Sequence, residues 1–87
     1  RVTSRYMSSS ELLLSNHNHW SAMVWSAKEA VYKLGGRRGV DLVEDMRVVE
    51  YDSHQCVARV AFGEGSMASV KLSFVDDKYV VAVATME

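Results

Sequence analysis

The chain has 87 residues, enough for one domain with a modest hydrophobic core and too few for two. Its formal net charge is −1, which excludes a protein that holds nucleic acid mainly through its own global positive charge. The single cysteine excludes an internal disulfide framework and fits an intracellular reducing compartment. No apolar run reaches the roughly 18–20 residues that span a bilayer, and no signal-peptide pattern is visible.

Residues 1–9 are polar and rich in serine, and they predict a loosely held N-terminal arm before a single α+β domain over residues 10–87. Glu11–Leu14, bounded by Ser10 and Ser15, is short and apolar. We interpret it as a first strand, although four residues do not separate a strand from a helix by period.

The clearest predicted element is an amphipathic helix from Trp20 to Leu34. Its apolar residues recur at helical spacing and cover about 120° of the helix circumference, the width of a core-facing stripe. Asn18 can cap the helix by accepting a hydrogen bond from the first turn. Gly35 and Gly36 end it, because glycine adopts the left-handed C-cap conformation without a Cβ penalty. The stripe consists of Trp20, Met23, Val24, Ala27, Ala30, Val31 and Leu34.

Two β-rich runs, Arg47–Tyr51 and Cys56–Phe62, predict a hairpin around the polar residues 52–55. A loop with an even number of residues places Tyr51 opposite Cys56. One face of the hairpin is then apolar and should meet the helix, and the other is half-polar. The predicted core-facing residues are Val49, Tyr51, Cys56, Ala58, Val60 and Phe62.

The segment Ser66–Val75 fits two periods. Val70, Leu72 and Phe74 alternate as in a strand, and the pattern alone slightly favours that interpretation, but the apolar residues also fit a helix. A final strand is predicted at Tyr79–Thr85. A strand at 66–75 would give one helix on a β-meander, whereas a helix there would give the order βαββαβ.

Three strings between Trp20 and Val60 carry a family resemblance: W-S-A-M-V-W-S-A-K-E-A-V-Y-K-L-G, M-R-V-V-E-Y-D and C-V-A-R-V. In this order they resemble the Pop5/Rpp14/Pop8 family of ribonuclease P/MRP protein subunits. Members of that family have a helix after the hairpin, so the resemblance implies that Ser66–Val75 is helical. The implied fold is a ferredoxin-like βαββαβ sandwich, a four-stranded antiparallel sheet with two helices on one face.

The same resemblance implies a function without catalysis by the chain itself. The protein would brace RNA and partner subunits of a ribonucleoprotein that processes tRNA and rRNA precursors in the nucleus and nucleolus. Its partners would be other protein subunits, above all a paralogous small subunit, and structured RNA. The near-neutral charge supports an alternative, a ferredoxin-like protein-interaction or ligand-sensing module that binds no RNA.

The helix also carries candidate partner-binding residues. Trp25 and Tyr32 lie seven residues apart on a side away from the core stripe, and Lys28 is predicted close to the same side. Large aromatic residues outside the core often supply binding energy at an interface. The alternative is that the rest of the monomer covers them.

The end of the helix carries candidate phosphate-binding residues. Lys33, Arg37 and Arg38 lie among glycines, where a cationic loop can approach phosphate oxygens closely. By the family resemblance these three residues would contact RNA. The alternative is a solvated loop whose charges suit the negative end of the helix dipole.

Metal and cofactor sites are not predicted. His17 and His19, and likewise His54 and Cys56, are spaced by two, which is not a usual zinc spacing, and Cys56 is expected in the core. No phosphate-binding glycine motif and no nucleophile with an adjacent base can be assembled. The sequence therefore predicts no cofactor, no metal and no catalytic residue.

Overall fold

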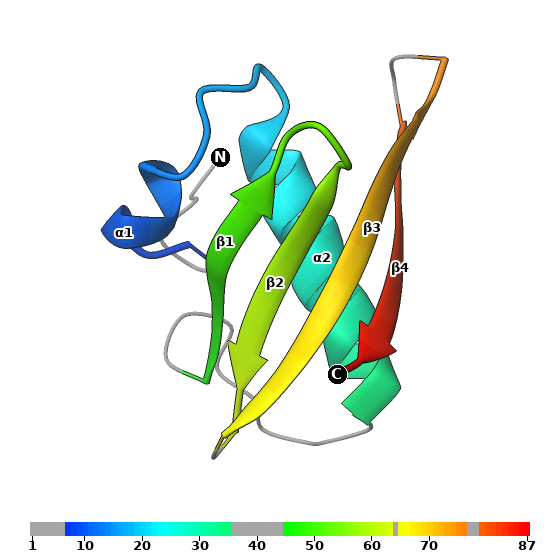
Figure 1. Ribbon diagram of the computed structural model, residues 1–87. Helices are drawn as coiled ribbons and strands as arrows, with labels where there is room; N and C mark the ends of the chain where they lie inside the picture. Colours follow the sequence, from blue (N-terminus) through cyan, green and yellow to red (C-terminus); the bar gives the residue numbers. More distant parts are fainter. Residues whose placement is uncertain (1–6, 36–44, 64, 77–78) are drawn as a thin grey trace.

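The computed structural model describes residues 7–35, 45–63, 65–76 and 79–87. Four strands form one antiparallel sheet in the order β1-β2-β3-β4, with α2 across one face and α1 beside β1 (Figure 1). The predicted α+β class and four-stranded antiparallel sheet are confirmed. The elements are α1 (Ser9–Leu12), α2 (Trp20–Gly35), β1 (Met46–Asp52), β2 (Val57–Phe62), β3 (Ser66–Val75) and β4 (Tyr79–Met86).

The amphipathic helix is present as predicted, and its apolar stripe packs on the sheet. Met23, Val24 and Ala27 are almost completely buried, because residues three and four apart share one face of a helix. The first intrahelical hydrogen bond runs from the N–H of Met23 to the carbonyl of His19 at 2.9 Å. His19 rather than Asn18 therefore stands at the cap position. Within the described ranges no helix is long and apolar enough to cross a membrane.

The helix predicted at Ser66–Val75 is wrong, because this segment is strand β3. Ala68, Val70 and Leu72 are buried against α2, while Lys71 and Ser73 point to the open face. The alternation with a period of two is that of a half-buried strand. The order βαββαβ is therefore replaced by a β-meander after α2, which is the alternative that the periodicity itself favoured.

The first strand predicted at Glu11–Leu14 is also wrong, because α1 occupies Ser9–Leu12. Ser8 accepts a hydrogen bond from the N–H of Glu11, and the Glu11 carboxylate accepts one from the N–H of Ser8. This reciprocal capping box satisfies two N–H groups that a helix start leaves without partners. The spacing Ser8-x-x-Glu11 was the sequence signal for it.

The predicted hairpin forms, but in a different register. Tyr51 lies opposite Ala58, not opposite Cys56, and a bulge falls between Val48 and Glu50. The bulge lets Val48 and Tyr51 both face the helix, and it leaves Val49 38% exposed. Val49 is therefore not a core residue, contrary to the prediction.

The core lies between α2 and the inner face of the sheet, and it begins before the predicted domain boundary. Met7 is 4% exposed and belongs to it, although residues 1–9 were predicted to be a loose arm. The ring of Trp20 lies 5.0 Å from that of Tyr51 and closes the end of the core near the β1–β2 turn. The other buried apolar residues are Met23, Val24, Ala27, Val31, Met46, Val48, Ala58, Val60, Ala68, Val70 and Leu72.

Candidate functional site

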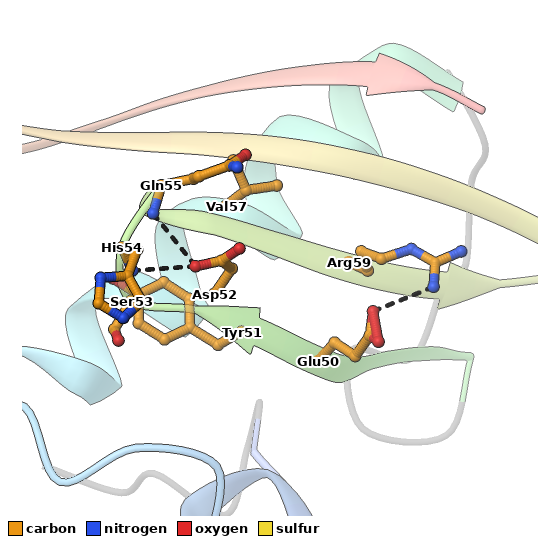
Figure 2. Close-up of a pocket in the computed structure, with 8 residues that line it drawn as sticks. All are labelled: Glu50, Tyr51, Asp52, Ser53, His54, Gln55, Val57 and Arg59. Atoms are coloured by element: carbon orange, nitrogen blue, oxygen red, sulfur yellow. Dashed lines mark hydrogen bonds and ion pairs between the residues drawn. The ribbon is translucent and has the colours of Figure 1, made fainter.

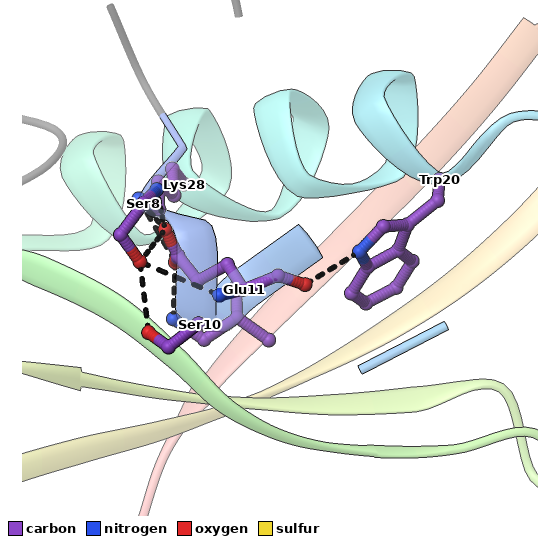
Figure 3. A network of polar contacts seen from close by, with 6 residues as sticks. Ser8, Ser10, Glu11, Trp20 and Lys28 are labelled. Atoms are coloured by element: carbon purple, nitrogen blue, oxygen red, sulfur yellow. Dashed lines mark hydrogen bonds and ion pairs between the residues drawn. The ribbon is translucent and has the colours of Figure 1, made fainter. Parts of the chain in front are cut away.

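A buried ion pair joins α2 to α1. The Nζ atom of Lys28 lies 3.0 Å from both carboxylate oxygens of Glu11, and both side chains are 0% exposed (Figure 3). Charged groups of this kind are stable in an interior only when they are paired and hydrogen-bonded. The pair therefore serves the fold, and neither charge is available to a molecule outside.

Glu11 also binds the backbone of two further segments. Its Oε2 atom accepts the N–H of Val48 in β1 at 2.6 Å, and its Oε1 atom accepts the N–H of Ser8 at 2.8 Å. Its carbonyl oxygen accepts the indole N–H of Trp20 at 2.8 Å (Figure 3). One residue thus connects the N-terminal segment, α1, α2 and the outer strand β1.

This placement corrects the prediction for Lys28. The residue was expected beside Trp25 and Tyr32 on an exposed side, where it could bind a partner, but it is enclosed. It follows Val24 by four residues and precedes Val31 by three, so it borders the core stripe. A lysine is accepted at this position because Glu11, which is distant in sequence, supplies the opposite charge.

The outer side of α2 carries an acidic residue, a basic residue and two aromatic residues. Trp25, Glu29 and Lys33 follow one another at intervals of four residues, which places them in one row along the helix. Glu29 is half-buried and Lys33 is exposed. Trp25 and Tyr32 are 41% and 37% exposed, so both lie outside the core as predicted. Their role in binding a partner remains a prediction.

A second polar region surrounds the β1–β2 turn. A cavity of about 510 Å³ lies there (Figure 2). The carboxylate of Asp52 accepts the N–H groups of His54 and Gln55 at 2.9 and 3.2 Å, which stabilises the turn. The carboxylate of Asp52 and the ion pair of Glu50 with Arg59 are thus engaged within the protein. The lining residues are Glu50, Tyr51, Asp52, Ser53, His54, Gln55, Val57 and Arg59.

Arg59 is the centre of an ion-pair network on the open face of the sheet. Its guanidinium donates to Glu50 at 3.0 Å, and to both carboxylate oxygens of Glu87 at 2.8 and 3.0 Å. Hydrogen bonds from Arg59 and then from Ser69 lower the pKa of Glu87 to about 2, and the bonds to the two carboxylates raise the pKa of Arg59. Burial, followed by a hydrogen bond with Cys56, raises the pKa of Tyr51.

The residues weighed as zinc ligands have other surroundings. His17 stacks on Phe74 with ring centroids 5.3 Å apart, and its Nδ1 atom accepts the N–H of His19 at 3.0 Å. Cys56 is half-buried in the turn with φ = 56°, so the prediction that it faces the core is wrong. Across the described ranges no three histidine, cysteine or acidic side chains are grouped so that they could hold a metal ion.

The charged side chains of the described ranges can be sorted by what they already bind. Lys28 and Arg59 hold carboxylates, and the Nζ atom of Lys71 donates to the carbonyl of Gln55. Within those ranges Lys33 and Arg47 make no such ion pair or hydrogen bond. Of these two, Lys33 lies one helical turn from an acidic residue, Glu29. Arg37 and Arg38 lie outside the described residues.

Among the described residues, the outer row of α2, which consists of Trp25, Glu29 and Lys33, is therefore the arrangement best suited to chemistry. Lys33 can donate hydrogen bonds to an anionic oxygen, and Glu29 can accept a proton from a hydroxyl group. Lys33 was predicted as a functional residue from the sequence, but Glu29 was not. The sequence signal for Glu29 is its spacing of four residues from Lys33 on the side of the helix opposite the core stripe.

A family model agrees with a chemical role for the chain. The model described as ACPS, the 4′-phosphopantetheinyl transferase superfamily, matches residues 1–84. No curated protein and no solved structure matches the chain.

This match overturns the predicted resemblance to the Pop5/Rpp14/Pop8 family. The functions that rested on it fall as well: a subunit of ribonuclease P/MRP, the processing of tRNA precursors, and partnership with RNA and a paralogous subunit. The prediction of a protein that is not an enzyme is contradicted too, since the matching family is one of transferases. The assignment of Lys33, Arg37 and Arg38 to RNA loses its premise.

Proposed function

The chain belongs to the 4′-phosphopantetheinyl transferase superfamily, and we propose that it transfers a 4′-phosphopantetheinyl group to an acyl carrier protein. The observation that carries this proposal is the family match, which extends over residues 1–84 of 87. The donor would be coenzyme A, in which this group is attached through a pyrophosphate. The acceptor would be a hydroxyl group on the carrier.

The proposed reaction is the transfer of a substituted phosphoryl group. A bond forms between the acceptor oxygen and the phosphorus of the transferred group, and the bond from that phosphorus to the bridging oxygen of the pyrophosphate breaks. The nucleotide part of coenzyme A leaves with the bridging oxygen, and the acceptor hydroxyl loses its proton to a base. Catalysis of such a transfer consists mainly of positioning and of neutralising the charge on the phosphate oxygens. A site for it needs at least one available cation and a group that can take a proton.

Lys33 and Glu29 supply these two groups in our proposal. Lys33 is exposed near the end of α2, so its ammonium group can reach phosphate oxygens of a donor. Glu29 lies one turn earlier in the same row, and its half-buried carboxylate can accept the proton of the attacking hydroxyl. Both roles use side chains that make no ion pair within the described residues.

Trp25 and Tyr32 are the proposed contacts for the protein acceptor. Trp25 lies four residues before Glu29 on α2 and Tyr32 lies three residues after it, so both rings neighbour Glu29 on the helix surface. Aromatic residues contribute strongly to protein interfaces when a partner covers them. A carrier bound on these rings would bring its hydroxyl group close to Glu29.

The direct test is a transfer assay. The chain would be incubated with coenzyme A, magnesium ions and a carrier protein in its unmodified form, and the mass of the carrier would be followed. We expect the carrier to gain the mass of one phosphopantetheinyl group. The Glu29→Gln and Lys33→Ala variants should lower the rate by about 10²-fold or more, as is typical when one proton acceptor or one charge-stabilising donor is removed.

Arg47→Ala is the matched control, because Arg47 is also an exposed cation but lies on β1. Its rate should equal that of the unaltered chain. A carrier that stays unmodified, while a known transferase modifies the same preparation, would contradict the proposed function. Transfer at an unchanged rate in Glu29→Gln and Lys33→Ala would support the proposed function but contradict the assignment of these two residues to its site.

A further inference from the structure

The carboxylate of Glu11 is held in place by donors from three segments of the chain. Its Oε2 atom accepts the N–H of Val48 at 2.6 Å, and its Oε1 atom accepts the N–H of Ser8 at 2.8 Å and the hydroxyl group of Ser8 at 3.1 Å. The Nζ atom of Lys28 lies 3.0 Å from both oxygens. Because Val48 belongs to β1, the carboxylate has a fixed position with respect to the sheet.

Glu11 holds α2 at two points. Its carboxylate binds Lys28, and its carbonyl oxygen accepts the indole N–H of Trp20 at 2.8 Å (Figure 3). Both donors belong to α2, and the eight residues between them correspond to about 12 Å at a helical rise of about 1.5 Å per residue. Two directional contacts this far apart fix the rotation of the helix about its axis and its position along that axis.

The apolar stripe of α2 does not supply the same precision. Met23, Val24 and Ala27 are buried against the sheet, but the hydrophobic effect is non-directional and distinguishes weakly between small rotations of the helix. A buried ion pair is often no more stabilising than apolar residues of similar volume. The pair of Glu11 and Lys28 therefore contributes a defined orientation of α2 rather than additional stability over an apolar core.

The orientation of α2 decides where its outer row lies. Glu29 directly follows Lys28 in the helix, and Lys33 lies one turn further on. Side-chain atoms lie about 5–6 Å from a helix axis, so a rotation of about 10° moves them by about 1 Å. A displacement of about 1 Å in a reacting group can lower a rate about 10²-fold.

We propose that Glu11 is a positioning residue for the transfer reaction, and this inference rests on the proposed function. Through Lys28 and Trp20 it fixes the rotation of α2. That rotation holds the carboxylate of Glu29 and the ammonium group of Lys33 where they act on the reacting atoms. Glu11 is 0% exposed and does not touch a substrate itself. Its loss should therefore lower kcat more than it weakens substrate binding.

The test uses the double variant Glu11→Gln with Lys28→Met in the 87-residue chain. Both charges are removed together, so no uncompensated charge remains in the interior and the variant should keep the native circular dichroism spectrum. Methionine has no N–H to donate, so the contact that orients α2 is lost. In the transfer assay we expect kcat to fall about 10- to 100-fold, with a smaller change in KM for coenzyme A.

A second measurement does not depend on transfer. In NMR spectra of the double variant, the backbone amide signals of Glu29 and Lys33 should shift, because α2 has rotated. Arg59→Gln is the matched control, since it also removes ion pairs, but on the open face of the sheet, away from α2. It should leave kcat and those amide signals unchanged.

A folded double variant with unchanged kcat, or with unchanged amide signals of Glu29 and Lys33, would overturn the inference and leave Glu11 a structural role alone. If the double variant did not fold, Glu11→Asp would decide, because it keeps the charge but withdraws the carboxylate by one methylene group. An unchanged kcat in that variant would also overturn the inference. If the unaltered chain transferred nothing, the proposed function would fail, and the NMR comparison would still decide whether Glu11 fixes α2.

Discussion

The two outer strands of the sheet, β1 and β4, show two ways in which one chain ends a sheet. β1 contains charged residues and a bulge at Val49, and the N–H of Val48 is held by the carboxylate of Glu11. β4 is uncharged and unbulged, and no described element runs along its outer side. The comparison indicates that the two edges of one sheet are protected independently of each other, and that an uncovered edge can pair with another strand.

The edge at β1 depends on a buried ion pair, so mutation of that pair should lower the stability of the protein more than a mutation at the β4 edge. Glu11→Gln leaves the Lys28 ammonium uncompensated in the interior, and we expect a loss of about 3–5 kcal/mol in the free energy of unfolding. Chemical denaturation measures this loss. Because small domains are only about 5–15 kcal/mol stable, the variant should be close to unfolding at 37 °C.

Two further variants sharpen that test. Glu29→Gln removes an acid from the outer side of the neighbouring helix and should change the unfolding free energy by less than about 0.5 kcal/mol. The double variant Glu11→Gln with Lys28→Met removes the uncompensated charge and should regain much of the lost stability. If Glu11→Gln unfolded at the same denaturant concentration as the unaltered chain, the buried pair would not hold the edge.

The same substitution on the two edges should have unequal effects. Val48 is 2% exposed in β1 and Val83 is 60% exposed in β4. Val48→Ala should reduce the unfolding free energy by about 2 kcal/mol through lost burial and a small cavity, whereas Val83→Ala should change it by less than about 0.5 kcal/mol. Denaturation at low micromolar concentration keeps association out of the measurement. Equal losses would mean that β4 is also covered in the monomer.

The contact of Trp20 with α1 should contribute a smaller amount. Trp20→Phe keeps an aromatic ring near Tyr51 but removes the N–H that donates to the carbonyl of Glu11, so a loss of about 1–2 kcal/mol is expected. Trp25→Phe, on the exposed side of the same helix, is the control for the change of ring. A greater loss for Trp25→Phe would show that the outer side of α2 is part of the core.

The smallest expected effect on stability is that of the exposed ion-pair network around Arg59, and this effect should depend on pH. The pKa of Glu87 falls from its usual 4.5 to about 2 in the folded state. A lowered pKa adds stability that is complete above pH 4.5 and disappears as the pH falls toward 2. Thermal unfolding should show a difference between the unaltered chain and Arg59→Gln that is constant above pH 5 and shrinks below pH 4.5. A difference that grows on acidification would contradict this assignment.

Much of the secondary structure could be predicted from pattern alone. The helix from Trp20, the hairpin and the final strand follow from periods of 3.6 and 2, and so does β3, because Val70, Leu72 and Phe74 alternate. The helix predicted at Ser66–Val75 came from a family resemblance that the family match contradicts. For residues 66–75 the alternation favoured a strand and the resemblance implied a helix, and the alternation was correct.

The candidate site was only partly predictable. Lys33 could be chosen as an exposed cation and Trp25 as an exposed ring, because both depend on position around one helix. That no described residue forms an ion pair with Glu29 or Lys33 could not be known from the sequence, since it depends on which acidic and basic residues the fold brings together. The family itself was missed, since the family model matches residues 1–84 and the sequence pattern was compared with another family.

By itself, the sequence determined the local elements of this protein: an amphipathic helix, four β-rich segments after it in the chain, and turns at glycine and aspartate. These depend on neighbouring residues, whose spacing is visible in one dimension. The tertiary structure decided that Lys28 is buried and that Val48 rather than Val49 faces the core. It also decided that Glu11 binds the edge strand β1, while no described strand pairs with the outer edge of β4. Each of these results depends on groups distant in sequence, such as the carboxylate of Glu11, whose position exists only once the chain has folded.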